Sequence, residues 1–257
     1  MKASSRPAIS FIASDARKAR EEARRLVTLY GQTPLAKADV IVALGGDGLM
    51  LRTLHRIMQK PKPIYGMNCG SVGFLMNEFR ADGLLERLAA AEPSVIHPLL
   101  MHAIGSKGRK LSAHAINEVS LLRQSAQAAK LSIAVDGKTR MAELIADGVL
   151  IATPAGSTAY NLSANGPILP LNAPMLALTP ISAFRPRRWG GALLPDRATI
   201  SISVRESGKR PVYAVADHAE LSGVKSVTVA MDRSIDLVLL HDPGHSLDER
   251  ILREQFG

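Results

Sequence analysis

The stretch "VIVALGGDGLMLRTLHRIM", residues 40–58, joins an unbroken apolar run to a second apolar pattern through two glycines, an aspartate and a third glycine. The apolar run over 40–44 predicts a short strand that is covered on both faces, as strands of parallel sheets are. The apolar residues between Met50 and Met58 recur at helical spacing. The stretch therefore predicts a strand, a glycine turn and a helix, which is the repeating unit of an α/β fold.

The flanking sequence repeats this unit on both sides. Apolar runs over 8–13 and 64–67 predict two more strands, and helical patterns follow both of them. The first of these helices is expected to take Ser14 or Asp15 as its N-cap and to stop at Gly31. Strands that alternate with helices favour an open, parallel, Rossmann-like sheet.

The pattern changes at about residue 95 and stays different to about residue 240. The segments there are β-branched or alternate with period two, and turn residues such as Asp136-Gly137 separate them, which is typical of antiparallel sheets. We expect an α/β domain over 1–95 that carries the glycine turn and a β-rich domain over 96–241. A C-terminal helix is expected over 242–257, and it can return to the first domain.

Composition excludes some classes of protein. The chain of 257 residues has one cysteine, Cys69, and no apolar run of the ~20 residues that cross a bilayer. We expect a cytoplasmic protein without a membrane partner. The net charge of +9 is compatible with a nucleic-acid partner. Aromatic residues make up only 4% of the chain, however, and no nucleic-acid recognition motif is present, so we expect no such partner. The basic patch at Arg185, Arg187 and Arg188 is either a solvated loop or a phosphate contact.

The glycine turn at the end of the second strand has the character of a phosphate site. Gly45 and Gly46 leave the backbone uncovered just before a helix, whose first N–H groups attract anions. Neither a P-loop nor a dinucleotide fingerprint is present. Asp47 would repel a phosphate, so a carboxylate at this turn indicates a different role, such as accepting a proton from a sugar hydroxyl. On this turn alone, simple capping of the helix explains Asp47 equally well.

Two further turns of the same kind follow. "GMNCGSVGFLMNE" over 66–78 follows the third strand, and "IADGVLIATPAGSTAYNLSANGPILP" spans 145–170. Small hydroxyl residues at a helix start are often N-caps. Three glycine-punctuated polar turns in one chain are harder to explain as coincidence, and they favour a ligand site.

These motifs, with "AINE" over 115–118, resemble the NAD kinase family in order and spacing from about residue 38 to about residue 220. The resemblance implies an α/β domain with a β-rich second domain. It implies transfer of a phosphoryl group from ATP, or from polyphosphate, to the adenosine-ribose 2′-hydroxyl of NAD, which forms NADP. It further implies Mg²⁺ bound with the phosphoryl donor, no dedicated protein metal site, and a homodimer or homotetramer in which a neighbouring subunit completes the site.

The resemblance also assigns residues. Asp47 matches the catalytic aspartate that bonds the ribose hydroxyl and takes its proton, and Asp147 matches the acidic residue at the nicotinamide end. Cys69, Ile145 and Asn165 depart from residues common in the family, which bears on phosphate affinity and donor choice. All the substrate-binding positions implied are Gly45, Gly46, Gly48, Phe74, Asn117, Glu118, Asp147, Thr158, Ala159, Tyr160, Ser163 and His218.

Two other functions compete with this one. A lipid kinase of the diacylglycerol type shares "GGDG" and a β-rich second domain, but the "GSTAYNLSANGP" block disfavours it. A dinucleotide sensor would keep the binding turns without turnover, and the intact Asp47 disfavours that. The remaining histidines show no metal-binding spacing and are expected to be surface or core residues.

Overall fold

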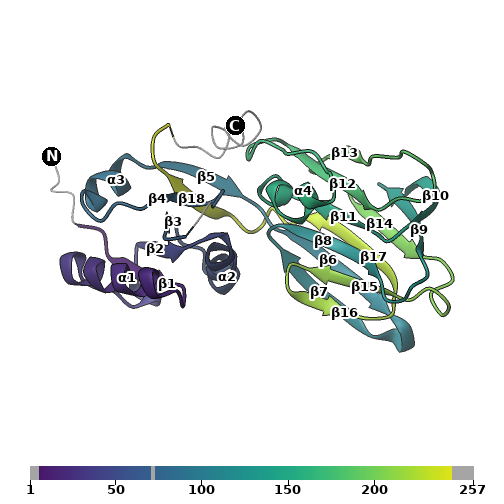
Figure 1. The fold of residues 1–257 in the computed structure, drawn as a ribbon, viewed down its shortest axis with the longest axis horizontal. Helices are drawn as coiled ribbons and strands as arrows, with labels where there is room; N and C mark the ends of the chain where they lie inside the picture. The colour runs from purple at the N-terminus through teal and green to yellow at the C-terminus, as the bar shows by residue number, and fades with distance from the viewer. Residues whose placement is uncertain (1–5, 71–72, 245–257) are drawn as a thin grey trace. The chain divides into compact units, whose positions relative to one another are not determined.

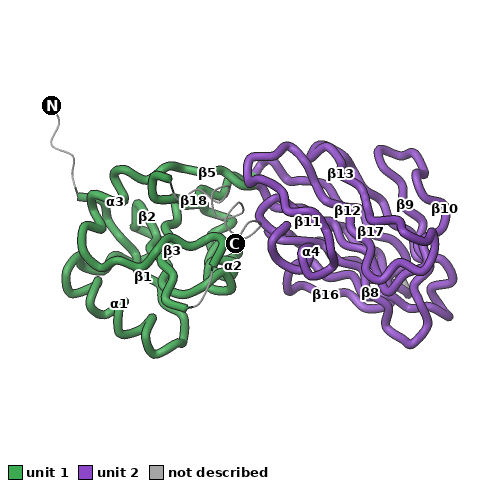
Figure 2. Tube along the Cα trace, turned by 45° about the horizontal axis from the view of Figure 1, so that its top comes forward, with its two compact units in different colours: residues 1–96, 235–257 green, residues 97–234 purple. Residues whose placement is uncertain are grey.

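The computed structural model describes residues 6–70 and 73–244. The chain forms two compact units, which Figure 2 colours separately. Unit 1 contains the chain up to Ile96 and again from Ile235 onward, and unit 2 is His97–Ser234. The chain therefore leaves the first unit, builds the whole of the second, and returns.

Unit 1 is built on a mostly parallel sheet with strand order β1-β2-β3-β18-β5, and β4 pairs with β3. Strands β1, β2, β3 and β18 run parallel, and β5 is antiparallel to β18. The strands are β1 (Ile9–Ala13), β2 (Val40–Gly45), β3 (Ile64–Asn68), β4 (Asn77–Glu78), β5 (Glu92–Ile96) and β18 (Leu237–His241). The helices are α1 (Arg17–Tyr30), α2 (Asp47–Ile57), α3 (Leu84–Ala90) and the 3-10 turn η1 (Leu35–Lys37).

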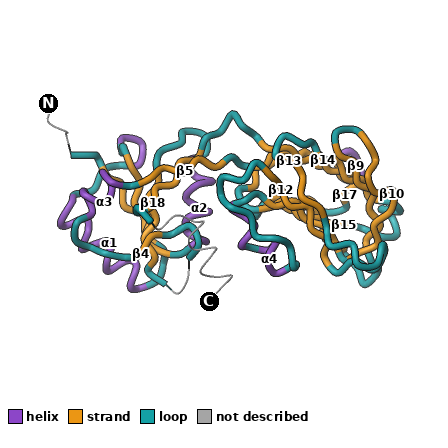
Figure 3. Tube along the Cα trace, turned by 90° about the horizontal axis from the view of Figure 1, so that it is seen from above, coloured by secondary structure: helices purple, strands orange, loops and turns teal. Residues whose placement is uncertain are grey.

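Helices cover both faces of this sheet (Figure 1 and Figure 3). Leu26 of α1 and Leu84 of α3 are buried in one core with Phe11, Val42 and Tyr65 of the strands. Helix α2 lies on the opposite face. All six residues of β2 are buried, which confirms the strand covered on both faces that its unbroken apolar run predicted.

Two expectations for unit 1 are corrected by the structure. Neither Ser14 nor Asp15 caps α1, because the N-cap position is Ala16 and no side chain bonds to the first turn. The segment over 237–241 was expected to belong to the β-rich domain, but it forms β18 between β3 and β5. Residues 245–257, most of the expected C-terminal helix, lie outside the described residues.

Side chains at the end of β18 anchor the returning strand. The Asp242 Oδ1 accepts a hydrogen bond from the Tyr65 hydroxyl, with 2.6 Å between the two oxygens, and the carboxylate pairs with the guanidinium of Arg87. The side chain of Asn77 donates to the carbonyl of Leu240 at 2.9 Å and accepts the Asp242 N–H at 3.0 Å. These contacts join residues more than 150 positions apart, which a local sequence pattern cannot indicate.

Unit 2 consists of two six-stranded sheets, with strand orders β10-β9-β14-β17-β6-β7 and β13-β12-β11-β8-β15-β16 (Figure 1). Neighbouring strands in both are antiparallel. The first sheet contains β6 (Leu99–Gly105), β7 (Lys110–Ala115), β9 (Ala129–Val135), β10 (Lys138–Ala146), β14 (Ile200–Val204) and β17 (Val224–Met231). The second contains β8 (Glu118–Arg123), β11 (Gly148–Ala152), β12 (Met175–Ile181), β13 (Ala192–Pro195), β15 (Val212–Ala216) and β16 (Ala219–Leu221).

The inward side chains of both sheets share one apolar core. Strand β9 shows how this core forms. Its residues alternate between buried and half-buried from Ala129 to Val135, so every second side chain faces the core. The turn after it uses Asp136 and Gly137 at φ 51° and 74°, as a tight two-residue hairpin requires. Short helical segments η2 (Ser106–Gly108), η3 (Ala155–Thr158) and α4 (Tyr160–Ser163) complete the unit. Within the described chain, no helix has the length and apolar character needed to span a membrane.

Candidate functional site

The glycine turn between β2 and α2 contains glycines with different roles. A Cβ atom on Gly45 would lie 2.9 Å from the Leu49 side chain and 3.2 Å from that of Ser14, so Gly45 lets the strand and helix pack. A Cβ on Gly46, the N-cap residue of α2, would meet no atom within 4 Å. Gly48 is exposed, and a Cβ atom there would lie 3.8 Å from the Arg52 side chain, its nearest neighbour. Gly46 thus leaves open space before the helix start, as an approaching anion needs.

Asp47, the first residue of α2, reaches across to the segment that follows β3. Its Oδ2 accepts the backbone N–H of Phe74 at 2.8 Å, and its Oδ1 accepts that of Leu75 at 3.0 Å. Gly73 permits this approach, since a Cβ there would lie 3.2 Å from Asp47 Oδ1 and 2.9 Å from Met76 Cγ. The structure therefore brings together two of the three polar turns that the sequence indicated.

In unit 2, Asp217 organises the loop that carries Asn117 and Glu118. Its carboxylate accepts three backbone N–H groups, from Ile116 at 2.6 Å, Asn117 at 3.1 Å and Glu118 at 3.2 Å. Asp217 itself sits at φ 49°, in the left-handed region, at the turn between β15 and β16. A short turn between strands thereby fixes the conformation of a loop 100 residues earlier.

The turn after β11 packs directly on the same loop. Thr153 donates its hydroxyl to the Ile116 carbonyl at 2.7 Å and its N–H to the Asn117 carbonyl at 2.9 Å. A Cβ on Gly156 would lie 2.1 Å from the Asn117 carbonyl oxygen, so only glycine fits there. The "PAGST" glycine is therefore required by this close approach of two backbones.

Glu118 is the most unusual ionisable group of this cluster. Burial, and then the negative charge of Asp217, raise the pKa of Glu118 to about 7, while a hydrogen bond from the Tyr160 backbone opposes the shift. Its Oε2 is buried without a hydrogen-bond partner among the described residues. Buried polar atoms are nearly always paired, so this oxygen is a candidate acceptor for a ligand hydroxyl.

Tyr160 and Asp147 lie close to Glu118. Burial, and then the charges of Glu118 and Asp147, raise the pKa of the Tyr160 hydroxyl. The Asp147 Oδ1 accepts the Nε–H of Arg123 at 2.5 Å, and the Asp147 side chain is 41% exposed. The part of this cluster open to solvent thus contains an aromatic ring, a carboxylate and a guanidinium.

Other residues of the "GSTAYNLSANG" block hold its shape. Asn161 is fully buried, donates to the carbonyls of Ser157 and Pro167, and accepts the Thr179 hydroxyl at 2.7 Å. The Ser157 hydroxyl donates to the Pro154 carbonyl at 2.7 Å. Asn165, one of the three departures from the family pattern, has φ 60°, which asparagine tolerates better than most residues.

The sequence-predicted residues fall into three groups. Gly45, Gly46, Asp47, Gly48 and Phe74 lie together in unit 1. Asn117, Glu118 and Asp147 gather in unit 2 around the segment Thr158, Ala159 and Tyr160, all three of them half-buried. Ser163, in the last turn of α4, and His218, at the β15–β16 turn, are exposed.

Two residues of this region were missed by the sequence analysis. The sequence pointed to His218, whereas its neighbour Asp217 makes the hydrogen bonds that shape the Asn117 loop. The signal was an aspartate in a tight turn between two apolar runs, "VYAVA" and "AEL", where Asp favours positive φ. Arg123 gave no local signal, because its partner Asp147 lies 24 positions further along the chain, between β10 and β11.

Among residues 6–70 and 73–244, no three His, Cys, Asp or Glu side chains gather in a way that could hold a metal ion.

Comparison with known proteins identifies the family. Residues 11–91 match the model of the ATP-NAD kinase N-terminal domain, and residues 116–235 match that of the ATP-NAD kinase C-terminal domain. An NAD kinase of Caulobacter vibrioides is 58% identical over 97% of this chain and 96% of its own length. An NAD kinase of Rhizobium meliloti is 57% identical over 97% of both chains.

Solved structures share the fold at low identity. A yeast NADH kinase in complex with NADH has a TM-score of 0.81 at 21% identity, covering 98% of this chain and 89% of its own. An NAD kinase from Archaeoglobus fulgidus in complex with ATP has a TM-score of 0.78 at 22% identity, covering 97% of this chain and 99% of its own. With both family models matched and close relatives aligned over nearly its whole length, this chain belongs to the NAD kinase family.

Proposed function

We propose that this protein transfers the γ-phosphoryl group of ATP to the 2′-hydroxyl of the adenosine ribose of NAD, which yields NADP and ADP. The observation that carries the proposal is the 58% identity to an NAD kinase over 97% of the chain, together with an intact Asp47 held at the glycine turn. A lipid kinase or a non-catalytic sensor has no such support.

Asp47 is the proposed catalytic residue. In the proposed step the ribose 2′-oxygen attacks the γ-phosphorus, the bond from that phosphorus to the ADP oxygen breaks, and the hydroxyl proton moves to the Asp47 carboxylate. Phosphoryl transfer depends mainly on alignment and charge stabilisation, so the base must above all be well placed. The two amides of Phe74 and Leu75 fix the Asp47 carboxylate, which supports this role.

The remaining predicted residues are proposed as binding groups. Gly46 and Gly48 leave the helix start accessible to the donor phosphates, and Gly45 lets the strand end pack close enough to the helix to form this turn. Phe74 packs beside the dinucleotide. The orphaned Oε2 of Glu118 accepts a ligand hydroxyl. The proposed dinucleotide-binding residues in unit 2 are Asn117, Glu118, Asp147, Thr158, Ala159, Tyr160, Ser163 and His218.

We also propose that Mg²⁺ or another divalent cation enters bound to the phosphoryl donor. Mg²⁺ keeps several waters and binds through substrate phosphates in many kinases, where it neutralises the charge on the transferred group. In that role it needs few protein ligands.

The decisive experiment is a coupled assay of NADP formation by purified protein with Mg-ATP and NAD. NADP formation above the rate without enzyme supports the proposal, and its absence under conditions where NAD binds would favour the sensor. Inorganic polyphosphate in place of ATP tests donor choice, and NADH in place of NAD tests the acceptor. Phosphorylation of diacylglycerol instead of NAD would favour a lipid kinase.

Localisation and assembly belong to the proposal as well. A single cysteine, Cys69, which is buried and free, is compatible with a reducing cytoplasm. We propose a homodimer or homotetramer in which a neighbouring subunit contributes to the dinucleotide site. Sedimentation velocity at assay concentrations tests the assembly, and a purely monomeric, fully active enzyme would contradict it.

A further inference from the structure

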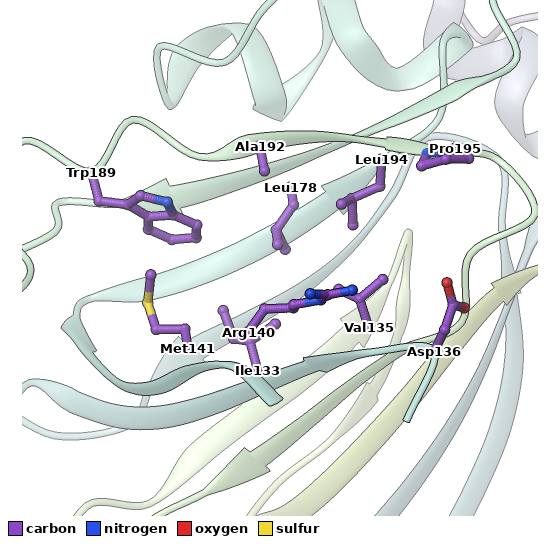
Figure 4. A pocket seen from close by; sticks show the side chains of 10 residues that line it. All are labelled: Ile133, Val135, Asp136, Arg140, Met141, Leu178, Trp189, Ala192, Leu194 and Pro195. Atoms are coloured by element: carbon purple, nitrogen blue, oxygen red, sulfur yellow. The ribbon is translucent and has the colours of Figure 1, made fainter. Parts of the chain in front are cut away.

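A cavity of about 470 Å³ opens within unit 2, and none of the residues that line it is among those assigned above (Figure 4). Its walls come from opposite sheets, with Ile133 and Met141 from β9 and β10 on one side and Leu178 and Leu194 from β12 and β13 on the other. Trp189 closes one end, and Asp136 lies at the other. Ligand pockets typically have this size and this apolar lining, with few polar groups.

One cation enters this apolar space because of a β-bulge. In the β9–β10 pairing, Thr139 faces Ala134 and Met141 faces Ile133, so Arg140 is an extra residue between them. Without the bulge, Arg140 and Met141 would point to opposite faces of the strand. The bulge turns both side chains into the cavity, as bulges near binding sites often do.

The guanidinium of Arg140 has no carboxylate partner among the described residues. The carboxylate that shares the cavity belongs to Asp136, and its Oδ1 accepts the N–H of Thr199 at 2.9 Å. Figure 4 shows the Arg140 side chain along the floor of the cavity, between the Trp189 end and Asp136. Arg140 is exposed, so its guanidinium lies where solvent meets the apolar lining. An anion that brings its own apolar body complements both the charge and the lining.

We propose that this cavity binds a small carboxylic acid with an apolar body, whose carboxylate pairs with Arg140 and whose apolar part packs against Trp189 and Met141. The planar fork of a guanidinium matches a carboxylate in two parallel hydrogen bonds. The ring of Trp189 offers a broad apolar surface at the end away from Asp136. The site is independent of the proposed kinase reaction, because none of its residues belongs to the motifs assigned to NAD or ATP.

The chain contains a built-in probe for this binding. Trp189 is its only tryptophan, so tryptophan emission reports on this cavity alone. Octanoate is the test ligand, and octan-1-ol is the neutral control with the same apolar chain. Titration of the full-length protein with octanoate should change the Trp189 emission saturably. Octan-1-ol should bind more weakly despite its greater hydrophobicity, and equal or tighter binding of octan-1-ol would overturn the proposal.

Substitution of Arg140 tests the ion pair. Arg140→Gln should weaken octanoate binding by about fivefold or more and leave octan-1-ol binding unchanged. The expected loss is modest because water weakens a charge-assisted hydrogen bond that it can reach. Lys138→Gln is the matched control, since Lys138 is an exposed cation on the same strand that does not line the cavity. Equal weakening by both variants would show a general charge effect and would refute the site.

A second copy of this chain could occupy the cavity instead. Sedimentation velocity with and without octanoate separates the two cases. An unchanged sedimentation coefficient alongside saturable Trp189 emission supports a ligand site. Dissociation of an oligomer by octanoate, or by Arg140→Gln alone, would identify the cavity as a subunit interface and overturn the proposal.

Discussion

The buried carboxyl group of Glu118 lies within electrostatic reach of the Asp217 carboxylate, which itself holds the backbone of the Glu118 loop. Burial first, and this negative charge second, raise the pKa of Glu118 to about 7. Burial and the charge of Asp217, which shapes this loop, together keep Glu118 partly protonated near neutral pH.

This pKa shift predicts a pH-dependent stability. The folded-state pKa of Glu118 lies above its ordinary value of 4.5, so the folded state holds a proton that the unfolded state releases. Glu118 therefore lowers the free energy of unfolding as pH rises from about 4.5 through about 7, by at most about 3 kcal/mol. Glu118→Gln should remove this loss and be the more stable protein at pH 8, as measured by urea unfolding without ligand.

The control for this measurement is Glu220→Gln, because Glu220 is exposed on β16 in the same unit. That variant should keep the pH dependence of the wild type. If Glu118→Gln and the wild type lose stability in parallel between pH 5 and pH 8, another group is responsible.

Replacement of the proposed base should separate chemistry from binding. Asp47→Asn should lower kcat by about 10²-fold or more while the NAD dissociation constant, from calorimetry, changes little. The variant also loses one acceptor for the amides of Phe74 and Leu75, which should lower the free energy of unfolding by about 1–3 kcal/mol. Turnover near that of the wild type would contradict the assignment of Asp47 as base.

Replacement by alanine should affect substrate binding at Gly46 and stability at its neighbour Gly45. Gly46→Ala meets open space, so the free energy of unfolding should change by no more than about 1 kcal/mol, while the KM for ATP rises because a methyl group occupies the approach of the phosphates. Gly45→Ala forces its Cβ to within 2.9 Å of Leu49 and should destabilise the fold by about 1–3 kcal/mol. An unchanged KM for ATP in Gly46→Ala would remove the phosphate role of this turn.

The returning strand should depend on one ion pair. Asp242→Ala removes the carboxylate that pairs with Arg87 and accepts from the Tyr65 hydroxyl, and both side chains of the ion pair are only 15% exposed. We expect a loss of about 3–5 kcal/mol in the free energy of unfolding, measured by urea denaturation. Glu21→Ala, which breaks the exposed Arg17–Glu21 pair, is the control and should cost less than about 1 kcal/mol. Similar losses in both variants would mean that the Asp242 contacts do not anchor the strand.

The sequence by itself determined the two kinds of architecture and the positions of the turns. The unbroken apolar run at Val40–Gly45 and the alternation at Ala129–Val135 record how many faces of each strand are buried, which is a local property. The family followed from ordered motifs, since each motif is a short run of neighbouring residues.

The tertiary structure alone decided which distant segments meet. Nothing in the apolar pattern of Leu237–His241 names β3 as its partner, because alternation fixes a buried face and leaves the neighbouring strand open. The bonds from Asp217 to the Asn117 loop, and from Asp47 to the amides of Phe74 and Leu75, likewise join groups far apart in the chain. Such contacts arise only when packing brings the segments together, so the sequence could single out Asp47 without showing which amides it binds.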